Sequence, residues 1–343
     1  RGSRSHLPIY PHPTRVWHVS KGITNMVDRM ALARKYVQLQ RQKRDDIIAA
    51  WVGGSVARGE ETESSDIDLI LMVAGDAGGQ DFGSRGATDT WQDGVYIEAT
   101  LASQSSYADL EEVLTDPFRV TDINYARILY DPTGVCTQLQ QQVQAVFMEP
   151  QWLGKRLHFW VELAREQVTA LRGAVAKSEW LGICYPAGWF SCAYVSVPVL
   201  RAGIAPSSTR GLAQLGALSE QSKRRLSAFE GSEQLSSEDV QALEPILTEW
   251  LPSSDRPTWG QLPEYFIKKA LWFSQQGLTQ EALHVMWLMV GGNAEYGRKL
   301  EPTAERARSG EPGTIPDTRR PPPIRRHWRQ SRAFRGSGRA PQP

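Results

Sequence analysis

The chain has few cysteines, no long apolar run and almost no net charge. Three cysteines without metal or redox spacing exclude a disulfide framework, and we expect reduced thiols in a cytoplasmic protein. No stretch is long and apolar enough to cross a membrane, and we expect neither a membrane partner nor a cleavable signal. The formal net charge of the 343 residues is only +1, so the composition does not indicate a nucleic-acid-binding protein.

The two ends of the chain differ in composition from its middle. The opening Arg-Gly-Ser-Arg-Ser-His is typical of an expression tag, so we expect residues 1–20 to be a disordered leader. Residues 299–343 are rich in arginine and proline, and we expect a disordered basic tail. Between them, strand-like segments in residues 21–148 are followed by helical periodicity in residues 149–298. This pattern predicts an α+β fold, in which a small mixed β-sheet flanked by helices precedes a helical bundle.

A glycine-serine turn followed by two aspartates is the most informative motif. The apolar residues 47–52 have the length of a buried strand, and Gly54 and Ser55 come just after it. Backbone N–H groups at the start of the following segment can face a phosphate. Asp66 and Asp68 then alternate with apolar residues, which predicts a second strand with both carboxylates on one face.

A third acid completes a pattern that suits a divalent cation. Residues 95–101 are strand-like and carry a single acid, Glu98. If this strand lies beside Asp66 and Asp68, Glu98 can hold a metal or take a proton from an attacking hydroxyl. Mg²⁺ prefers oxygen ligands and is commonly completed by substrate phosphates. Each feature alone is common on protein surfaces, but their order along the chain favours a nucleotide and metal site.

In these motifs the chain resembles the nucleotidyltransferase superfamily of the polymerase-beta type, and within it the aminoglycoside nucleotidyltransferases. The resemblance covers roughly residues 45–150 and includes a strand-and-helix block at residues 128–134. It implies transfer of a nucleoside monophosphate, with Mg²⁺ as cofactor and ATP or another nucleoside triphosphate as co-substrate. The residues implied to bind the nucleotide are Gly54, Ser55, Arg58 and Ser65, and those implied to bind metal are Asp66, Asp68 and Glu98.

The helical part is expected to bind the acceptor. Helical spacing predicts a first helix that breaks at Gly173, a second over residues 186–200 with a kink at Pro198, and later helices over residues 239–250, 261–275 and 279–296. The resemblance implies a general base on the first of these helices, where Glu162 and Glu166 are one turn apart. A solvated helix face is the plainer interpretation of both, and Glu98 is then the natural base.

The identity of the acceptor stays open at this stage. Residues 1–300 carry 29 basic against 34 acidic side chains, a balance that suits a small cationic hydroxylated substrate better than a nucleic acid. The same motif also occurs in enzymes that modify lincosamides, proteins or RNA ends. A non-catalytic nucleotide-binding regulatory module is a further alternative, although such a binder has no need for three metal-site acids. By analogy with the family, the protein is a monomer or a homodimer.

Overall fold

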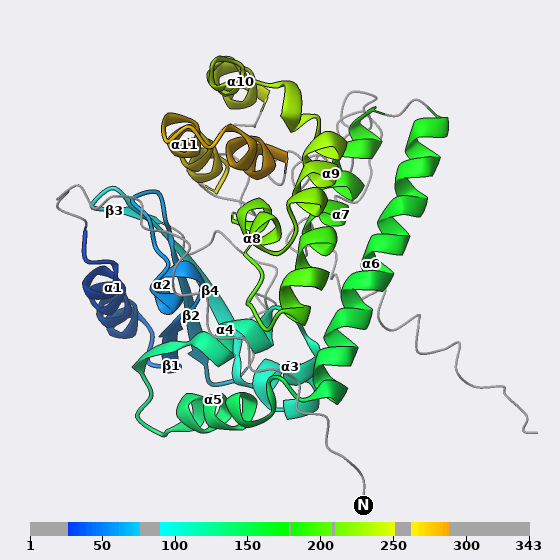
Figure 1. The fold of residues 1–343 in the computed structure, drawn as a ribbon. Helices are drawn as coiled ribbons and strands as arrows, with labels where there is room; N and C mark the ends of the chain where they lie inside the picture. The colour runs from blue at the N-terminus through cyan, green and yellow to red at the C-terminus, as the bar shows by residue number, and fades with distance from the viewer. Residues whose placement is uncertain (1–26, 76–89, 178–179, 208–209, 251–261, 288–343) are drawn as a thin grey trace, which may run out of the picture.

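The computed structural model describes residues 27–75, 90–177, 180–207, 210–250 and 262–287. A five-stranded sheet with helices on both faces is followed by a set of helices beside and above it (Figure 1). This arrangement confirms the predicted α+β class. The predicted leader and basic tail lie outside the described residues.

The sheet is mixed, and its order brings the predicted acidic strands together. Its strands run in the order β3-β4-β2-β1-β5. Only β2 and β4 pair in parallel, whereas the pairs β1–β2, β1–β5 and β3–β4 are antiparallel. The strands span Ile47–Val52 (β1), Ile67–Val73 (β2), Thr90–Gln92 (β3), Val95–Ser103 (β4) and Arg127–Tyr130 (β5). The apolar segments recognised in the sequence are therefore strands.

Two apolar layers hold the sheet, because side chains alternate between its faces. On β2, Leu69 and Leu71 pack toward the first helix, whereas Ile70 and Met72 pack into a second cluster on the opposite face. Asp68 shares the second face with Ile70 because the two residues are two positions apart. The helices are α1 (Arg29–Lys43) on the first face, the short α2 (Gly54–Arg58) after β1, and α3 (Leu110–Thr115), α4 (Arg119–Tyr125) and α5 (Val135–Val146) on the second; the single turn η1 (Gln104–Tyr107) follows β4.

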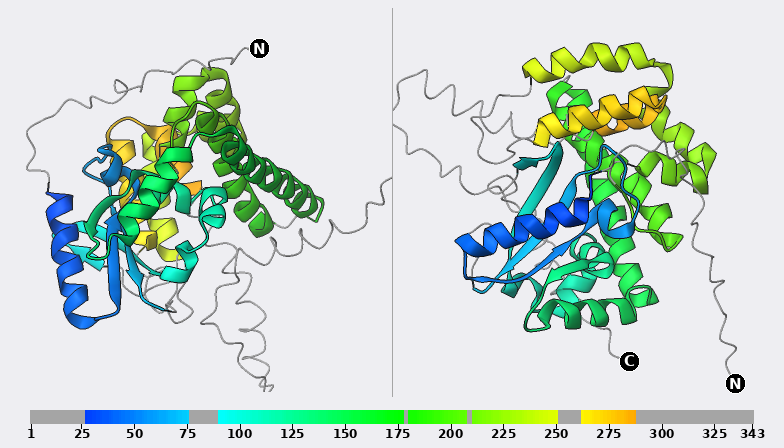
Figure 2. Two further views of the ribbon diagram at one scale, coloured as in Figure 1. Left: turned by 90° about the horizontal axis from the view of Figure 1, so that it is seen from below. Right: turned by 90° about the vertical axis from the view of Figure 1, so that its left-hand side faces the viewer.

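The rest of the described chain is helical, as the two further views show (Figure 2). None of the helices in the described ranges is long and apolar enough to cross a membrane. Residues 279–287 are also helical, and the remainder of the helix expected up to residue 296 lies outside the described residues. The elements are α6 (Pro150–Ala176), α7 (Trp180–Arg201), α8 (Gly211–Leu218), α9 (Glu220–Glu230), η2 (Ser232–Gln234), α10 (Ser237–Trp250) and α11 (Leu262–Gln275).

Two helix boundaries differ from the sequence prediction. Helix α6 continues through Gly173 to Ala176, and α7 begins at Trp180, six residues before Pro186. A glycine in a helix costs only about 1 kcal/mol relative to alanine. The apolar contacts between α6 and α7, centred on Trp160, outweigh such local preferences.

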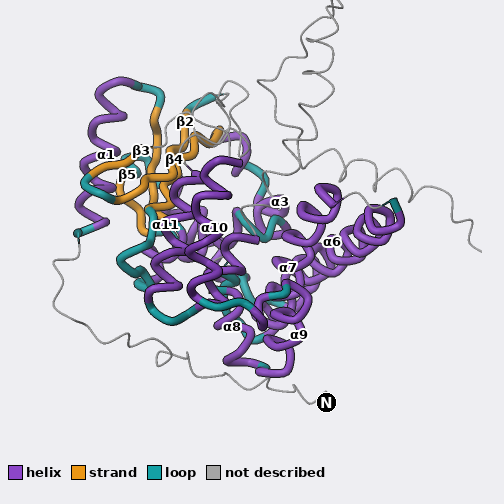
Figure 3. Tube along the Cα trace, turned by 90° about the horizontal axis from the view of Figure 1, so that it is seen from above, coloured by secondary structure: helices purple, strands orange, loops and turns teal. Residues whose placement is uncertain are grey.

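A buried arginine connects α6 to the sheet-containing part of the chain. Arg156 is 0% exposed and donates hydrogen bonds to the carbonyl oxygens of Leu114, at 3.2 Å, and Phe147. Removal from water lowers the pKa of this guanidinium to about 10. At the other end of the molecule, α11 lies beside β3 and β4, and α10 lies next to α11 (Figure 3). The helices therefore contact the sheet-containing part at Arg156 and again at α11, and the contact of α11 lies beside the strands that carry the acids.

Candidate active site

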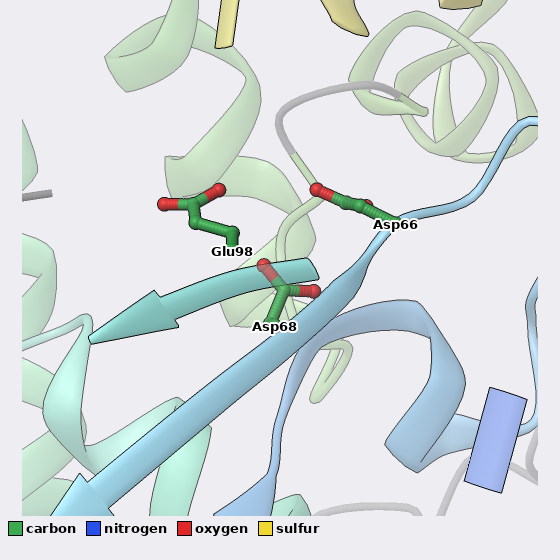
Figure 4. Close-up of side chains that lie close together, drawn as sticks. All are labelled: Asp66, Asp68 and Glu98. Atoms are coloured by element: carbon green, nitrogen blue, oxygen red, sulfur yellow. The ribbon is translucent and has the colours of Figure 1, made fainter. Parts of the chain in front are cut away.

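The three acids singled out in the sequence lie together on the second face, near the start of β2. Asp66 directly precedes β2, Asp68 is the second residue of β2, and Glu98 lies on β4 (Figure 4). Asp68 and Glu98 are direct partners in the parallel register. One carboxylate oxygen from each residue lies within 4.8 Å of the others, and Asp66 is buried while the other two are half-buried. This geometry allows one cation to contact all three carboxylates.

Gly54 brings the backbone of α2 directly against Asp68. Its φ of +58° lies in the left-handed region, which favours glycine. A Cβ atom at this position would lie 1.6 Å from Asp68 Oδ2. The backbone N–H of Gly53 also donates to the carbonyl oxygen of Asp68, at 2.8 Å. The glycine-serine turn and the aspartate strand therefore form one packed unit, and only glycine fits at its centre.

Hydrogen bonds from α1 hold the segment that leads into Asp66. Arg29 donates to the carbonyl oxygens of Ser65, at 2.9 Å, and Glu63, at 2.7 Å. The Ser65 hydroxyl oxygen accepts a hydrogen bond from the backbone N–H of Thr62, at 2.9 Å. The predicted nucleotide contact Ser65 thus has a role in the turn itself. Removal from water lowers the pKa of Arg29, and the charges of nearby acidic groups partly offset this lowering.

The other two predicted nucleotide residues lie on α2. Ser55 is half-buried near the start of the helix. Arg58, at its end, forms an ion pair with Glu60 at 2.8 Å, and its side chain is only 10% exposed. These positions keep a hydroxyl and a guanidinium on the short segment that follows the glycine turn.

Three other acidic groups crowd around Asp68. Removal from water is the largest cause that raises the pKa of Asp68 well above its usual value, followed by the charges of Asp66 and Glu98. Asp122 on α4 raises it further, and Lys269 partly offsets these effects. Crowded carboxylates of this kind gain stability when a cation joins them. Oxygen donors from three carboxylates fit a hard divalent cation such as Mg²⁺.

Sequence reasoning missed two residues of α11 that reach the acidic cluster. The Tyr265 hydroxyl donates to Asp66 Oδ1 at 2.9 Å, and its ring stacks on Tyr96 with the ring centroids 5.2 Å apart. The Lys269 ammonium lies 3.7 Å from the same Asp66 oxygen and donates to the Tyr265 hydroxyl. Tyr265 and Lys269 are four residues apart and so share a helix face. The spacing predicts that the two side chains lie side by side, but it does not predict which acid they contact.

Neither acid proposed on α6 belongs to this cluster. Among the residues that the structure describes, the group that can hold a metal consists of Asp66, Asp68 and Glu98. Glu162 pairs with Arg165 at 2.5 Å on its own helix, and Glu166 is exposed. A role for either as the general base stays a prediction.

Comparison with known proteins agrees with this geometry. Residues 34–116 match the family model described as a nucleotidyltransferase domain, and this range includes the glycine turn and all three acids. A search of curated proteins found no match. Among solved structures, a nucleotidyltransferase-like protein from Exiguobacterium sibiricum 255-15 is 12% identical over 79% of this chain and 81% of its own, with a TM-score of 0.33. Over residues 34–116 the chain is thus similar to a nucleotidyltransferase domain.

Proposed function

We propose that the protein is a metal-dependent nucleotidyltransferase that transfers AMP from ATP to a hydroxyl of a small cationic molecule, an aminoglycoside antibiotic being the favoured acceptor. The observation that carries the proposal is the convergence of Asp66, Asp68 and Glu98 beside the Gly54 turn. The nucleotidyltransferase domain match over the same residues supports it.

In the proposed reaction, the acceptor hydroxyl oxygen attacks the α-phosphorus of the nucleoside triphosphate. A new P–O bond forms, the bond between the α-phosphorus and the bridging oxygen breaks, and pyrophosphate leaves with that oxygen. Mg²⁺ bound by the three carboxylates would offset negative charge on the phosphates. Catalysis of this kind depends mainly on positioning and electrostatics rather than on covalent chemistry by the protein.

We assign Glu98 to take the proton of the acceptor hydroxyl, because a carboxylate has two oxygens and one can accept the proton while the other faces the cation. What supports this choice over Glu162 and Glu166 is its place opposite Asp68 in the β2–β4 register. A general base must lie within hydrogen-bond reach of the proton that it removes. Glu162, by contrast, is paired with Arg165 on α6.

The remaining residues on the glycine turn would hold the triphosphate. Ser55 supplies a hydroxyl near the start of α2, and Arg58 supplies a guanidinium at its end. Arg58 would exchange its ion pair with Glu60 for a phosphate oxygen, because guanidinium groups bind phosphates by charge-assisted hydrogen bonds. Gly54 would let the phosphates approach the backbone closely.

The charge of the chain supports a cationic acceptor. Residues 1–300 have five more acidic than basic side chains, 34 against 29, and carboxylates bind amines by charge-assisted hydrogen bonds. Aminoglycosides carry several amines and hydroxyls. Lincosamides, proteins and RNA ends are the other acceptors to be tested.

Pyrophosphate release in the presence of Mg²⁺ and ATP tests the proposal. The wild type and the Asp66→Ala variant would each be incubated with a panel of aminoglycosides and lincosamides. Release that requires both an aminoglycoside and Asp66 supports the full proposal, and mass spectrometry of the drug should show the added AMP. Release with a lincosamide alone would overturn the aminoglycoside assignment but keep the reaction type. If ATP binds but no small molecule supports release, a protein or RNA acceptor becomes the next candidate.

A further inference from the structure

Helix α11 places a positive charge inside the acidic cluster. Lys269 is 5% exposed, and its ammonium lies 3.7 Å from Asp66 Oδ1. Tyr265 donates to the same oxygen and also receives a hydrogen bond from Lys269. A lysine this well buried needs a compensating negative charge, and the described structure provides one in Asp66. The contact therefore joins α11 to the strand that carries Asp68.

A divalent cation in the cluster would be coordinated by the carboxylate of Asp66, which Lys269 already contacts. Asp66 contributes to the group of three oxygens that lie within 4.8 Å of one another. Two cations that share one carboxylate repel each other, and the repulsion is strong where water is excluded. Binding of the metal and the contact of Lys269 with Asp66 should therefore weaken one another.

We propose that Lys269 and Tyr265 form a metal-sensitive latch, in which a divalent cation bound by Asp66, Asp68 and Glu98 competes with Lys269 for Asp66 and loosens α11 from the sheet. This inference rests on the metal site of the proposed function. It makes Lys269 a positioning residue, which acts through Asp66 and determines where α11 lies. By the same coupling, anything that detaches α11 raises the affinity for the metal.

The remaining contacts of α11 with the sheet are weaker than the latch. Tyr265 stacks on Tyr96 with an angle of 17° between the ring planes, and the Lys268 ammonium lies 4.1 Å from the ring centroid of Trp91. Lys268 also pairs with Glu264, and its side chain is 57% exposed. Aromatic contacts and exposed cation–π contacts are individually weak, so loss of the buried ionic contact should change the mobility of the helix.

Lys268 provides a matched control for Lys269, because the two lysines are neighbours on α11 and only Lys269 contacts an acid of the cluster. Mn²⁺ affinity of the full chain would be measured by isothermal titration calorimetry for the wild type, Lys269→Met, Lys269→Gln and Lys268→Met. We expect both Lys269 variants to bind Mn²⁺ roughly tenfold more tightly, because a like charge at a few ångströms has been removed. Lys268→Met should stay within about twofold of the wild type. Damage to the fold would weaken binding and so cannot imitate the expected increase.

Hydrogen exchange of the α11 amides tests whether a bound metal loosens α11 from the sheet. In the wild type, saturating Mn²⁺ should accelerate exchange in α11 relative to protein in EDTA, whereas in Lys269→Gln exchange should be faster from the start and insensitive to metal. Equal or lower Mn²⁺ affinity in both Lys269 variants, or slower exchange of α11 in wild type with metal, would overturn the latch. The Asp68→Asn variant separates the two proposals. If it binds Mn²⁺ as wild type does, the metal site and the latch both fail; if it loses binding while the Lys269 variants match wild type, only the latch fails.

Discussion

Replacing Gly54 by alanine should displace Asp68 from the acidic cluster. The added Cβ would lie 1.6 Å from Asp68 Oδ2 and 2.5 Å from its Cγ. Carbon atoms in contact are about 3.5–4.0 Å apart, so the carboxylate must move by roughly 1 Å or more. A misplacement of about 1 Å at a catalytic centre can cost about 100-fold in rate. We therefore expect pyrophosphate release to fall at least about 100-fold and Mn²⁺ affinity to fall with it.

Gly134→Ala is the matched control for this change. Gly134 has a φ of +76°, similar to the +58° of Gly54, but a Cβ at Gly134 would have no neighbour within 4 Å. Both variants place alanine in the left-handed region, at a cost of roughly 1–2 kcal/mol of stability measured by urea unfolding. Only Gly54→Ala should lose metal binding and turnover. If the two variants have the same turnover and the same Mn²⁺ affinity, the proposed packing of Gly54 against Asp68 is refuted.

Three further changes test the electrostatics and the hydrogen bonds of the site and of the start of α5. Asp68→Asn should abolish turnover yet raise the melting temperature in EDTA. The pKa of Asp68 is raised in the folded state, so its ionised form destabilises the fold. The difference in melting temperature between the variant and the wild type, measured by calorimetry, should therefore shrink as pH falls. Arg29→Met removes the hydrogen bonds to the carbonyl oxygens of Ser65 and Glu63, each a charge-assisted bond worth about 1.5–3 kcal/mol. We expect kcat to fall at least about tenfold, with near-wild-type circular dichroism. Asp131→Ala removes the carboxylate that accepts from the Thr137 backbone N–H at 2.8 Å, and should cost about 1 kcal/mol in urea unfolding at neutral pH. Burial opposes ionisation of Asp131, but its hydrogen bonds outweigh burial and lower its pKa, so this loss should disappear as pH falls through that pKa.

Much of the layout of the candidate site could be predicted because its signals are local. The apolar run of β1, the glycine that follows it and the alternation around Asp68 each follow from short-range geometry. The third acid, Glu98, was predictable as a strand residue, and the parallel pairing of β2 with β4 then places it opposite Asp68. The sequence predicted that Glu98 lies on a strand, but it did not predict that this strand pairs with β2.

Helix boundaries were less predictable where packing outweighs local preference. Gly173 suggests a break and Pro186 suggests a start, yet α6 and α7 run through these positions. Contacts between the two helices, such as those of Trp160, favour longer helices than the residues alone predict. Such contacts depend on residues far apart in the chain.

The sequence by itself determined the three acids and the glycine turn of the candidate site, because they lie in short segments with their own strand and turn geometry. The tertiary structure decided which other groups share that site. Tyr265 and Asp66 are 199 residues apart, and no local pattern links them. Lys269 lies in the cluster only because α11 packs across β4, where Tyr265 stacks on Tyr96. The position of a charge on a distant helix depends on how the whole chain packs, and a single sequence carries no short-range signal for it.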